Sequence, residues 1–320
     1  MGGIEVNSEI LAGYFLSQGH EVRLVTQSRG GDGRKFPYPV FRNPPPRELI
    51  ALRRWADVVY QNNIELGTLW PGLLVRRPTV ISVRTWIRDD DGRIRWAHRL
   101  KKWTLCRVDA VIAISEAIRR DSFEGAVVIG NPYRSGLFRV LPDIVRQNSI
   151  AFLGRFVSDK GADLLIRAFA EASCGAGLTL IGSGPEEPAL RRLAEELGVD
   201  VRFAGQLHGE DLVRELNRHE ILAVPSLWEE PFGNVALEGM ACGCVVLGSN
   251  GGGLPDAIGS AGLLFERGNV RDLAEKLRRL LSDSDLRNSL RSKAPAHLEN
   301  HREEVVASRY LDILRKAARQ

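Results

Sequence analysis

The sequence has few of the residues that would build a disulfide scaffold, a metal site or a membrane span. Its four cysteines are too few and too scattered for a disulfide framework, and its six histidines show no His-Glu-x-x-His spacing. No run approaches the roughly 20 apolar residues of a bilayer-spanning helix, and Glu5 and Glu9 stand where a signal peptide would be basic. We therefore expect reduced thiols, no bound metal and a cytoplasmic location.

The composition is that of a globular protein. Hydrophobic residues make up 44% of the chain and charged residues 26%, which excludes disorder, a collagen-like repeat or a coiled coil as the main architecture. At about 150 residues per domain, 320 residues predict roughly two domains.

Positive charge is concentrated in the first half of the chain. Residues 1–150 hold 23 Lys and Arg against 15 Asp and Glu, whereas the remainder is acidic overall. Ten of these cations lie close together: Arg76, Arg77, Arg84, Arg88, Arg93, Arg95, Arg99, Lys101, Lys102 and Arg107. Such a block suits phosphate, an anionic membrane surface or an acidic acceptor, but equally a solvated helix face. Nucleic acid is not an expected partner, because no recognised binding motif accompanies the charge.

Short β-branched runs alternate with segments of helical period along the whole chain. Several of the runs are apolar on both faces, as parallel strands covered by helices are. The expected strands are Glu21–Thr26, Asp57–Tyr60, Thr79–Arg84, Asp109–Ile114, Ala126–Ile129, Ile150–Leu153, Leu178–Ile181, Val201–Ala204, Ile221–Val224 and Val245–Gly248. This alternation predicts an α/β protein with doubly wound parallel sheets.

The pattern lapses near residues 130–148, which suits a linker between two domains. We expect domains at 1–140 and 146–302, with the helical segment 303–320 able to pack back on the first. We expect the first domain to lack its opening strand, because Met1 leads directly into glycines and a helix. Either the start was placed too late or the sheet lacks a member near its centre.

The most informative segment runs from Ser226 to Gly243, after an expected strand. Pro231 and Gly233 place Glu230 in a loop, whereas Glu238 lies on the following helix, so both carboxylates can face one crevice. Between them, backbone amides at a helix N-terminus attract an anion such as a diphosphate. The segment therefore combines carboxylates suited to sugar hydroxyls with a phosphate cradle.

A second segment, Ala151–Gly161, places two cations after a buried strand. Arg155 and Lys160 stand on the loop that follows the strand, and Ser158 or Asp159 can cap the next helix. Two fixed cations at a strand end can hold a pyrophosphate without a metal.

Together these motifs resemble a known family. In order they are Gly-Arg-x4-Lys-Gly at 154–161, Ile-Gly-Ser-Gly-Pro-Glu at 181–186, Phe-Ala-Gly at 203–205, Pro-Ser-x3-Glu-Pro-Phe-Gly at 225–233 and Gly-Gly-Leu-Pro-Asp at 252–256. The sequence is similar to the retaining GT-B glycosyltransferases of family four. The resemblance implies two Rossmann-like domains facing a cleft.

The resemblance also gives matched residues their roles. Arg155 and Lys160 would neutralise the donor diphosphate, Glu230 would hold the transferred sugar, and Glu238 would hold the ribose. The other expected donor contacts are the amides of Phe232, Gly233, Asn234 and Val235, the base-side turn at Leu207, the wall glycines Gly182 and Gly184, and the first-domain residues Gly2, Gly3 and Arg84.

Arg84 departs from the family pattern, which often has a His at this strand end. An Arg there can bind a carboxylate or phosphate instead.

Two further patterns resemble motifs of other protein classes but do not predict their functions. The Asp89–Asp91 run resembles a metal motif of another glycosyltransferase architecture, but Gly92 and nearby arginines predict an exposed turn. Gly182 and Gly184 resemble the start of a dinucleotide-binding turn. Pro185 and Glu186 replace the rest of its glycine fingerprint, so we do not expect a dehydrogenase.

The sequence thus predicts a metal-independent, retaining glycosyltransferase that needs no cofactor. It would move a sugar from a nucleotide-diphosphate sugar to the hydroxyl of a glycan, lipid-linked or small-molecule acceptor, with peripheral contact at the inner face of a membrane. The alternatives are an epimerase or phosphorylase on the same fold, or an inactive homologue that binds a nucleotide sugar as a sensor or scaffold. The absent strand favours the scaffold, whereas the joint presence of Arg155, Lys160, Glu230 and Glu238 favours the transferase.

Overall fold

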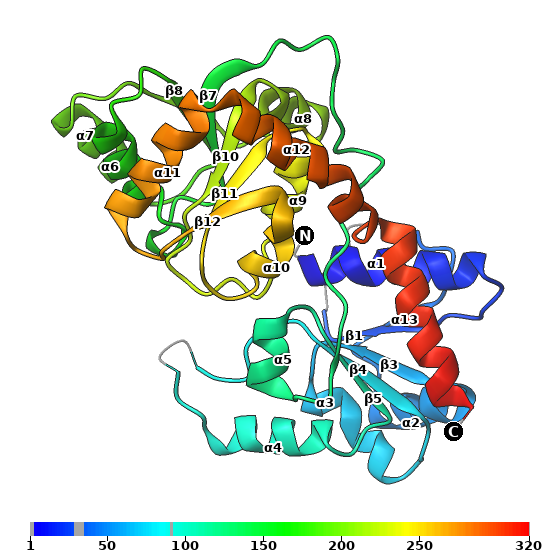
Figure 1. The fold of residues 1–320 in the computed structure, drawn as a ribbon. Coiled ribbons are helices and arrows are strands. Elements are labelled where there is room, and N and C mark those ends of the chain that lie inside the picture. The colour runs from blue at the N-terminus through cyan, green and yellow to red at the C-terminus, as the bar shows by residue number, and fades with distance from the viewer. Residues whose placement is uncertain (1–2, 29–34, 90–91, 320) are drawn as a thin grey trace. The chain divides into compact units, whose positions relative to one another are not determined.

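The computed structural model describes residues 3–28, 35–89 and 92–319. The chain forms two compact units (Figure 1): unit 1 comprises Met1–Asn131 with Glu303–Gln320, and unit 2 comprises Pro132–Arg302. Each unit contains parallel β-structure and helices. This is the α/β architecture with two Rossmann-like domains that the sequence predicted.

The strands of unit 1 form two separate sheets. The strands β1 (Leu24–Thr26) and β2 (Val40–Arg42) pair in parallel, and a four-stranded parallel sheet has the order β3-β4-β5-β6. These four strands are β3 Val59–Asn62, β4 Thr79–Val83, β5 Ala110–Ala113 and β6 Val127–Val128. The helices are α1 Gly3–Ser17, α2 Pro46–Trp55, α3 Leu66–Leu69, the 3-10 helix η1 Trp70–Leu73, α4 Trp96–Leu105, α5 Glu116–Ser122 and α13 Glu303–Ala318.

The C-terminal helix α13 completes the core of unit 1. It packs beside α1 and crosses the sheet (Figure 1), and its buried residues Val306, Tyr310 and Leu314 recur every four positions. They meet Leu11 of α1 and Val80 of β4 in one cluster. The last segment of the chain therefore belongs with the first.

Unit 2 contains one parallel six-stranded sheet in the order β12-β11-β10-β7-β8-β9. Its strands are β7 Gln147–Leu153, β8 Gly177–Ile181, β9 Val201–Gly205, β10 His219–Val224, β11 Val245–Ser249 and β12 Gly262–Phe265. The chain begins at the centre with β7, moves outward to β9, and returns to place β10 on the other side of β7. In a doubly wound sheet this reversal creates a crevice at the carboxyl ends of the two central strands, where ligands bind.

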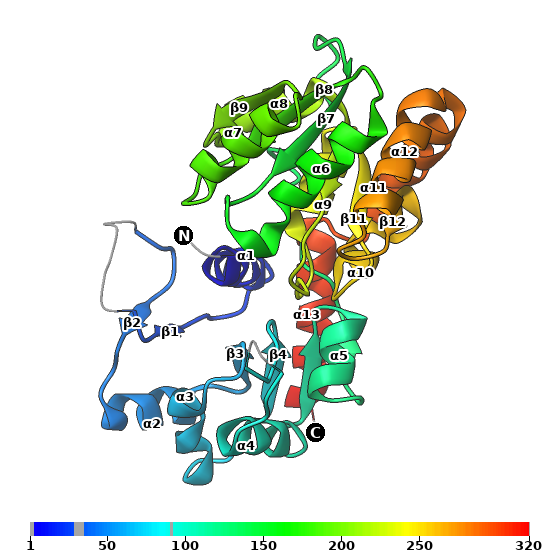
Figure 2. The same cartoon turned by 90° about the vertical axis from the view of Figure 1, so that its left-hand side faces the viewer.

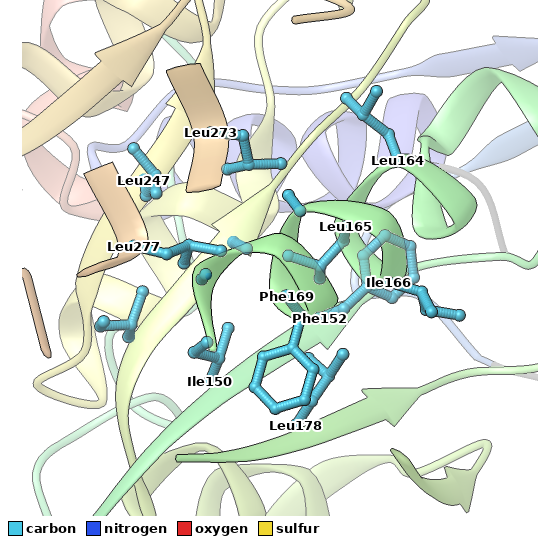
Figure 3. Packing of buried hydrophobic residues seen from close by; sticks show 14 of the residues in the cluster. Ile150, Phe152, Leu164, Leu165, Ile166, Phe169, Leu178, Leu247, Leu273 and Leu277 are labelled. Carbon is cyan, nitrogen blue, oxygen red and sulfur yellow. The ribbon is translucent and has the colours of Figure 1, made fainter. Parts of the chain in front are cut away.

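Helices on both sides of the six-stranded sheet enclose the core of unit 2 (Figure 2). They are η2 Ser158–Lys160, α6 Ala162–Ala172, α7 Glu187–Glu196, α8 Gly209–Asn217, α9 Asn234–Ala241, α10 Leu254–Ile258, η3 Gly259–Ala261, α11 Val270–Ser282 and α12 Ser284–Glu299. Figure 3 shows Ile150 and Phe152 of β7 close to Leu165 and Phe169 of α6. Among the helices of the described ranges, none is both long and apolar enough to span a bilayer.

The expected domain boundary is wrong for residues 132–140, which belong to unit 2. The reason is a set of hydrogen bonds that only the folded chain brings together. Asn217 of α8 donates through Nδ2 to the carbonyl of Arg139 (2.9 Å) and accepts through Oδ1 from the amide of Leu141 (2.8 Å). The amide of Tyr133 donates to the carbonyl of His301 (3.1 Å).

Two strands, β2 and β12, were missing from the sequence-based assignment. Both lie at the edge of a sheet, and most of their residues are only partly buried. β12 reads Gly-Leu-Leu-Phe and carries no β-branched residue. Their strand conformation therefore depends on the neighbouring strand more than on their own sequence.

Gly182, directly after β8, lies very close to the backbone of the loop that follows β7. Gly182 has φ +144°, and a Cβ placed there would lie 1.9 Å from the carbonyl oxygen of Gly154. Gly175, at φ +62°, has nothing within 4 Å of such a Cβ. We expect Gly182→Ala to cost about 3 kcal/mol or more of unfolding free energy, and Gly175→Ala about 1 kcal/mol. Denaturant unfolding of both variants measures this, and equal losses would contradict the close approach.

Candidate functional site

Two loops meet at the point where the strand order of unit 2 reverses. The loop after β7 carries Lys160 and the loop after β10 carries Glu230, and their side chains form an ion pair with Nζ and Oε1 2.5 Å apart. Ser226 donates to the same carboxylate oxygen at 3.0 Å. Because β7 and β10 are neighbours in the sheet, residues from the two most informative sequence segments lie side by side.

Backbone contacts fix these two loops against each other. The carbonyl of Asp159 accepts hydrogen bonds from the amides of Leu227 (2.9 Å) and Trp228 (3.1 Å). Gly161 has φ +67°, and a Cβ there would lie 2.1 Å from the carbonyl oxygen of Pro225. Only glycine permits this approach, so the Lys-Gly pair of the sequence motif supplies one charged side chain and one residue without a side chain.

A third loop, after β11, supports the backbone of Glu230. The amide of Gly253 donates to the carbonyl of Glu230 at 2.7 Å. A Cβ at Gly252 would lie 2.3 Å from the same carbonyl oxygen, and one at Gly253 would lie 2.3 Å from that of Pro231. The glycines of the Gly-Gly-Leu-Pro-Asp motif therefore pack under the carboxylate loop.

The helix α9 begins between the two glutamates. Its N-cap, Gly233 (φ +105°), provides no side chain to cap the first turn, and helix N-termini attract anions. Phe232 is buried, and its ring packs against that of His301 with centroids 5.5 Å apart. Of the four predicted amide contacts, Asn234 and Val235 lie in the first turn, and Phe232 can contribute only its backbone.

Glu238 lies one turn further along α9 and is partly buried. Burial raises the pKa of its carboxyl group to about 7, and the nearby Arg134 opposes that rise. Arg134 is not among the residues predicted from the sequence. It stands in the segment that was assigned to the first domain, and the only available signal was its position in a Gly-Asn-Pro-Tyr-Arg run.

The remaining predicted residues of unit 2 lie on the loops after β7, β8 and β9. Arg155 has an exposed side chain, and Leu207 is partly buried. The amide of Gly182 donates to the carbonyl of Gly205 at 2.8 Å. A Cβ at Gly184 would lie 2.3 Å from the carbonyl oxygen of Phe156. These contacts join the three loops into one wall.

Arg84 lies at the end of β4 in unit 1 and is only 6% exposed. Its Nη2 donates to Asn7 Oδ1 (2.7 Å) and the Tyr310 hydroxyl (3.0 Å), its Nη1 donates to Asn131 Oδ1 (2.7 Å), and its Nε donates to Asn62. Four of the five N–H groups of the guanidinium are thus engaged by neutral groups of its own unit. Its predicted donor contact stays a prediction.

The structure gives few contacts for the other residues singled out in the first domain. Gly3 opens α1, and Gly2 lies outside the described residues. Asp89 pairs with Arg95 at 2.6 Å, whereas Asp90 and Asp91 also lie outside the described residues. Over the described ranges, no group of three or more His, Cys, Asp or Glu side chains is arranged to hold a metal.

Comparison with known proteins identifies the family. The sequence model described as "Glycosyl transferases group 1" matches residues 138–297, which include both central loops and α9. The chain belongs to this family. A second model, "Glycosyltransferase Family 4", matches residues 1–128. Curated relatives are named glycosyltransferases, and the resemblance to family four of the GT-B glycosyltransferases is confirmed.

Two curated relatives come from corynebacteria. A D-inositol 3-phosphate glycosyltransferase of Corynebacterium jeikeium is 39% identical over 172 residues, which is 48% of this chain and 39% of the relative. A GDP-mannose-dependent monoacylated alpha-(1-6)-phosphatidylinositol monomannoside mannosyltransferase of Corynebacterium glutamicum is 35% identical over 181 residues, which is 53% of this chain and 48% of the relative. The aligned part thus spans about half or less of these relatives.

A solved structure agrees over nearly the whole chain. Anabaena HepE in complex with UDP superposes with a TM-score of 0.85 at 20% identity, covering 98% of this chain and 96% of that chain. The similarity supports the GT-B fold of two Rossmann-like domains.

The Lys160–Glu230 pair predicts a measurable coupling. The two side chains are only 21% and 16% exposed, so removing one leaves the other charge half-buried without its partner. We expect Lys160→Met and Glu230→Gln each to lower the unfolding free energy by about 1–3 kcal/mol, and the double variant to lose less than the sum by about 1–2 kcal/mol.

The control for this cycle is the ion pair between Arg191 and Glu187 on the surface of α7, which has a similar separation of 2.7 Å but a half-exposed arginine. Its coupling should be at most about 0.5 kcal/mol. If urea denaturation gives equal coupling for the two pairs, partial burial does not strengthen the Lys160–Glu230 interaction.

The raised pKa of Glu238 predicts a pH-dependent stability. The folded protein holds a proton on this carboxyl group up to about pH 7, whereas the unfolded chain loses it near 4.5, so stability falls as the pH rises between these values. Glu238→Gln, which cannot ionise, should be more stable than the parent by about 2 kcal/mol near pH 8 and similar near pH 4. Thermal melts at several pH values test this, and parallel profiles would mean that Glu238 titrates normally.

Proposed function

We propose that this chain transfers a sugar from a nucleotide-diphosphate sugar to an acceptor hydroxyl, with retention of configuration and without a metal. The observation that carries the proposal is the meeting of Lys160 with Glu230 at the switch point of the sheet, on the loop that leads into α9 and its N-cap glycine. A cation, a carboxylate and a helix N-terminus at one place suit the junction between a diphosphate and a sugar.

The donor would lie with its diphosphate on Lys160, Arg155 and the first turn of α9. These groups would stabilise the negative charge that develops on the departing diphosphate. Glu230 would accept hydrogen bonds from hydroxyls of the transferred sugar, and Glu238 from those of the ribose.

Donor binding would exchange partners at the ion pair. Without a ligand, Lys160 and Glu230 neutralise each other at 2.5 Å. With a nucleotide sugar bound, Lys160 would pair with a phosphate and Glu230 would accept a hydrogen bond from a hydroxyl. Neither half-buried charge would then lack a partner. The pair therefore holds both side chains at the positions where the donor needs them.

Retention would follow from attack on the same face as the leaving phosphate. The acceptor proton would pass to a phosphate oxygen of the departing diphosphate, so the reaction needs no carboxylate nucleophile.

Turnover measurements on cation variants test the proposal. Arg155→Ala and Lys160→Ala should each lower turnover at least tenfold, or about 1.4 kcal/mol of transition-state stabilisation, because each removes positive charge from the leaving diphosphate. Arg167→Ala is the matched control, since this arginine is exposed on the helix that follows the same loop.

The donor is first chosen from a panel of nucleoside diphosphates and nucleotide sugars by thermal shift. Near-normal turnover in a folded Arg155→Ala/Lys160→Ala double variant would remove the diphosphate assignment. Conversion of the donor in the absence of acceptor to an epimeric sugar would indicate an epimerase. Donor binding with no product under any acceptor would indicate a sensor or scaffold.

A further inference from the structure

The helix α4 of unit 1 exposes large apolar side chains on its outer face. Trp96 is 77% exposed and Trp103 is 52% exposed, and Leu100 between them is also exposed. These positions are spaced by four and three residues, so they form one stripe along the helix. Leu105, on another face, is buried. A helix that only presents a solvated charged face would not place its aromatic residues outward.

Other apolar residues of unit 1 are exposed as well. Ile94, just before α4, is exposed, and the turn at the end of η1 exposes Leu73 (87%) and Leu74. Both views place α3, which leads directly into η1, at the same end of unit 1 as α4 (Figures 1 and 2). We define the exposed apolar residues at this end of unit 1 as the α4 surface: Leu73, Leu74, Ile94, Trp96, Leu100 and Trp103.

Cations accompany the α4 surface. Arg99 lies on the same face as Trp96, Arg107 stacks on Trp103 with its guanidinium carbon 3.7 Å from the ring centroid, and Arg76 is exposed after η1. Arginine and tryptophan side chains together suit the boundary between water and lipid, where tryptophan rings reside and cations meet head-group phosphates.

The structure also shows which cations of the basic block do not serve this surface. Arg84 is buried, Lys102 lies 3.9 Å from the carboxylate of Asp121, and Arg95 pairs with Asp89. The sequence does not show which cations have partners within unit 1 and which face outward. The exposed tryptophans of α4 identify the outward group.

We propose that the α4 surface docks on an anionic lipid bilayer. Trp96, Leu100 and Trp103 would enter the head-group region, while Arg76, Arg99 and Arg107 would contact anionic lipid phosphates. The charge argues against a second copy of this chain as the occupant, because two such surfaces would bring like charges together. The proposal stands independently of sugar transfer.

Vesicle co-sedimentation tests the proposal with the complete chain. The parent should bind vesicles of equal parts phosphatidylcholine and phosphatidylglycerol, bind pure phosphatidylcholine far more weakly, and lose affinity as salt rises. Trp96→Ser/Trp103→Ser should weaken binding at least tenfold at every salt concentration. Arg99→Gln/Arg107→Gln should weaken it about tenfold at low salt and flatten the salt dependence.

Matched controls separate docking from folding and from net charge. Lys316→Gln/Arg319→Gln removes two exposed cations of the same unit, one on α13 and one just after it, and should bind nearly as the parent does. Thermal melts show whether each variant is folded. Absence of parent binding at low salt, or parent-like binding by the tryptophan variant, overturns the proposal. The proposal is also overturned if the parent forms an oligomer, the tryptophan variant is monomeric, and the two bind lipid equally. The α4 surface would then join copies of the chain.

Discussion

The close contact between the loops after β7 and β10 is the constraint on which the site depends. Gly161 lies against the carbonyl of Pro225, and the carbonyl of Asp159 accepts two amides of the facing loop. These contacts hold Lys160 and Glu230 together in a half-buried position, where a lone charge would be costly. The glycines therefore matter as much as the charged residues, since any side chain at Gly161 would push the two loops apart.

The sequence predicted the parts of this arrangement that are recorded locally. Short apolar runs indicated the central strands, and the loops that follow them were identified as carrying Lys160 and Glu230. Their meeting followed from sheet topology, because β7 and β10 become neighbours in a doubly wound order. The resemblance to a family supplied the roles, which local patterns cannot.

Features that depend on distant residues were not predictable in the same way. The effect of Arg134 on Glu238 and the hydrogen bonds of Asn217 to residues 139 and 141 join segments that are far apart in the sequence. Arg84 is similar: its strand-end position was predicted, but its partners come from α1, β3, α13 and the segment after β6. With neutral acceptors from these elements, the arginine ties unit 1 together.

The discontinuity of unit 1 affects how the chain can fold during synthesis. Unit 2 is one continuous segment, whereas the core of unit 1 needs α13, the last helix described. A ribosome that has released residues 1–302 has supplied everything that unit 2 requires, but it still withholds Tyr310 from Arg84 and Leu314 from the apolar cluster. The first unit to be made is thus the second to be completed, and until then the apolar side chains that pack against α13, such as Val80 and Leu11, lack part of their cover.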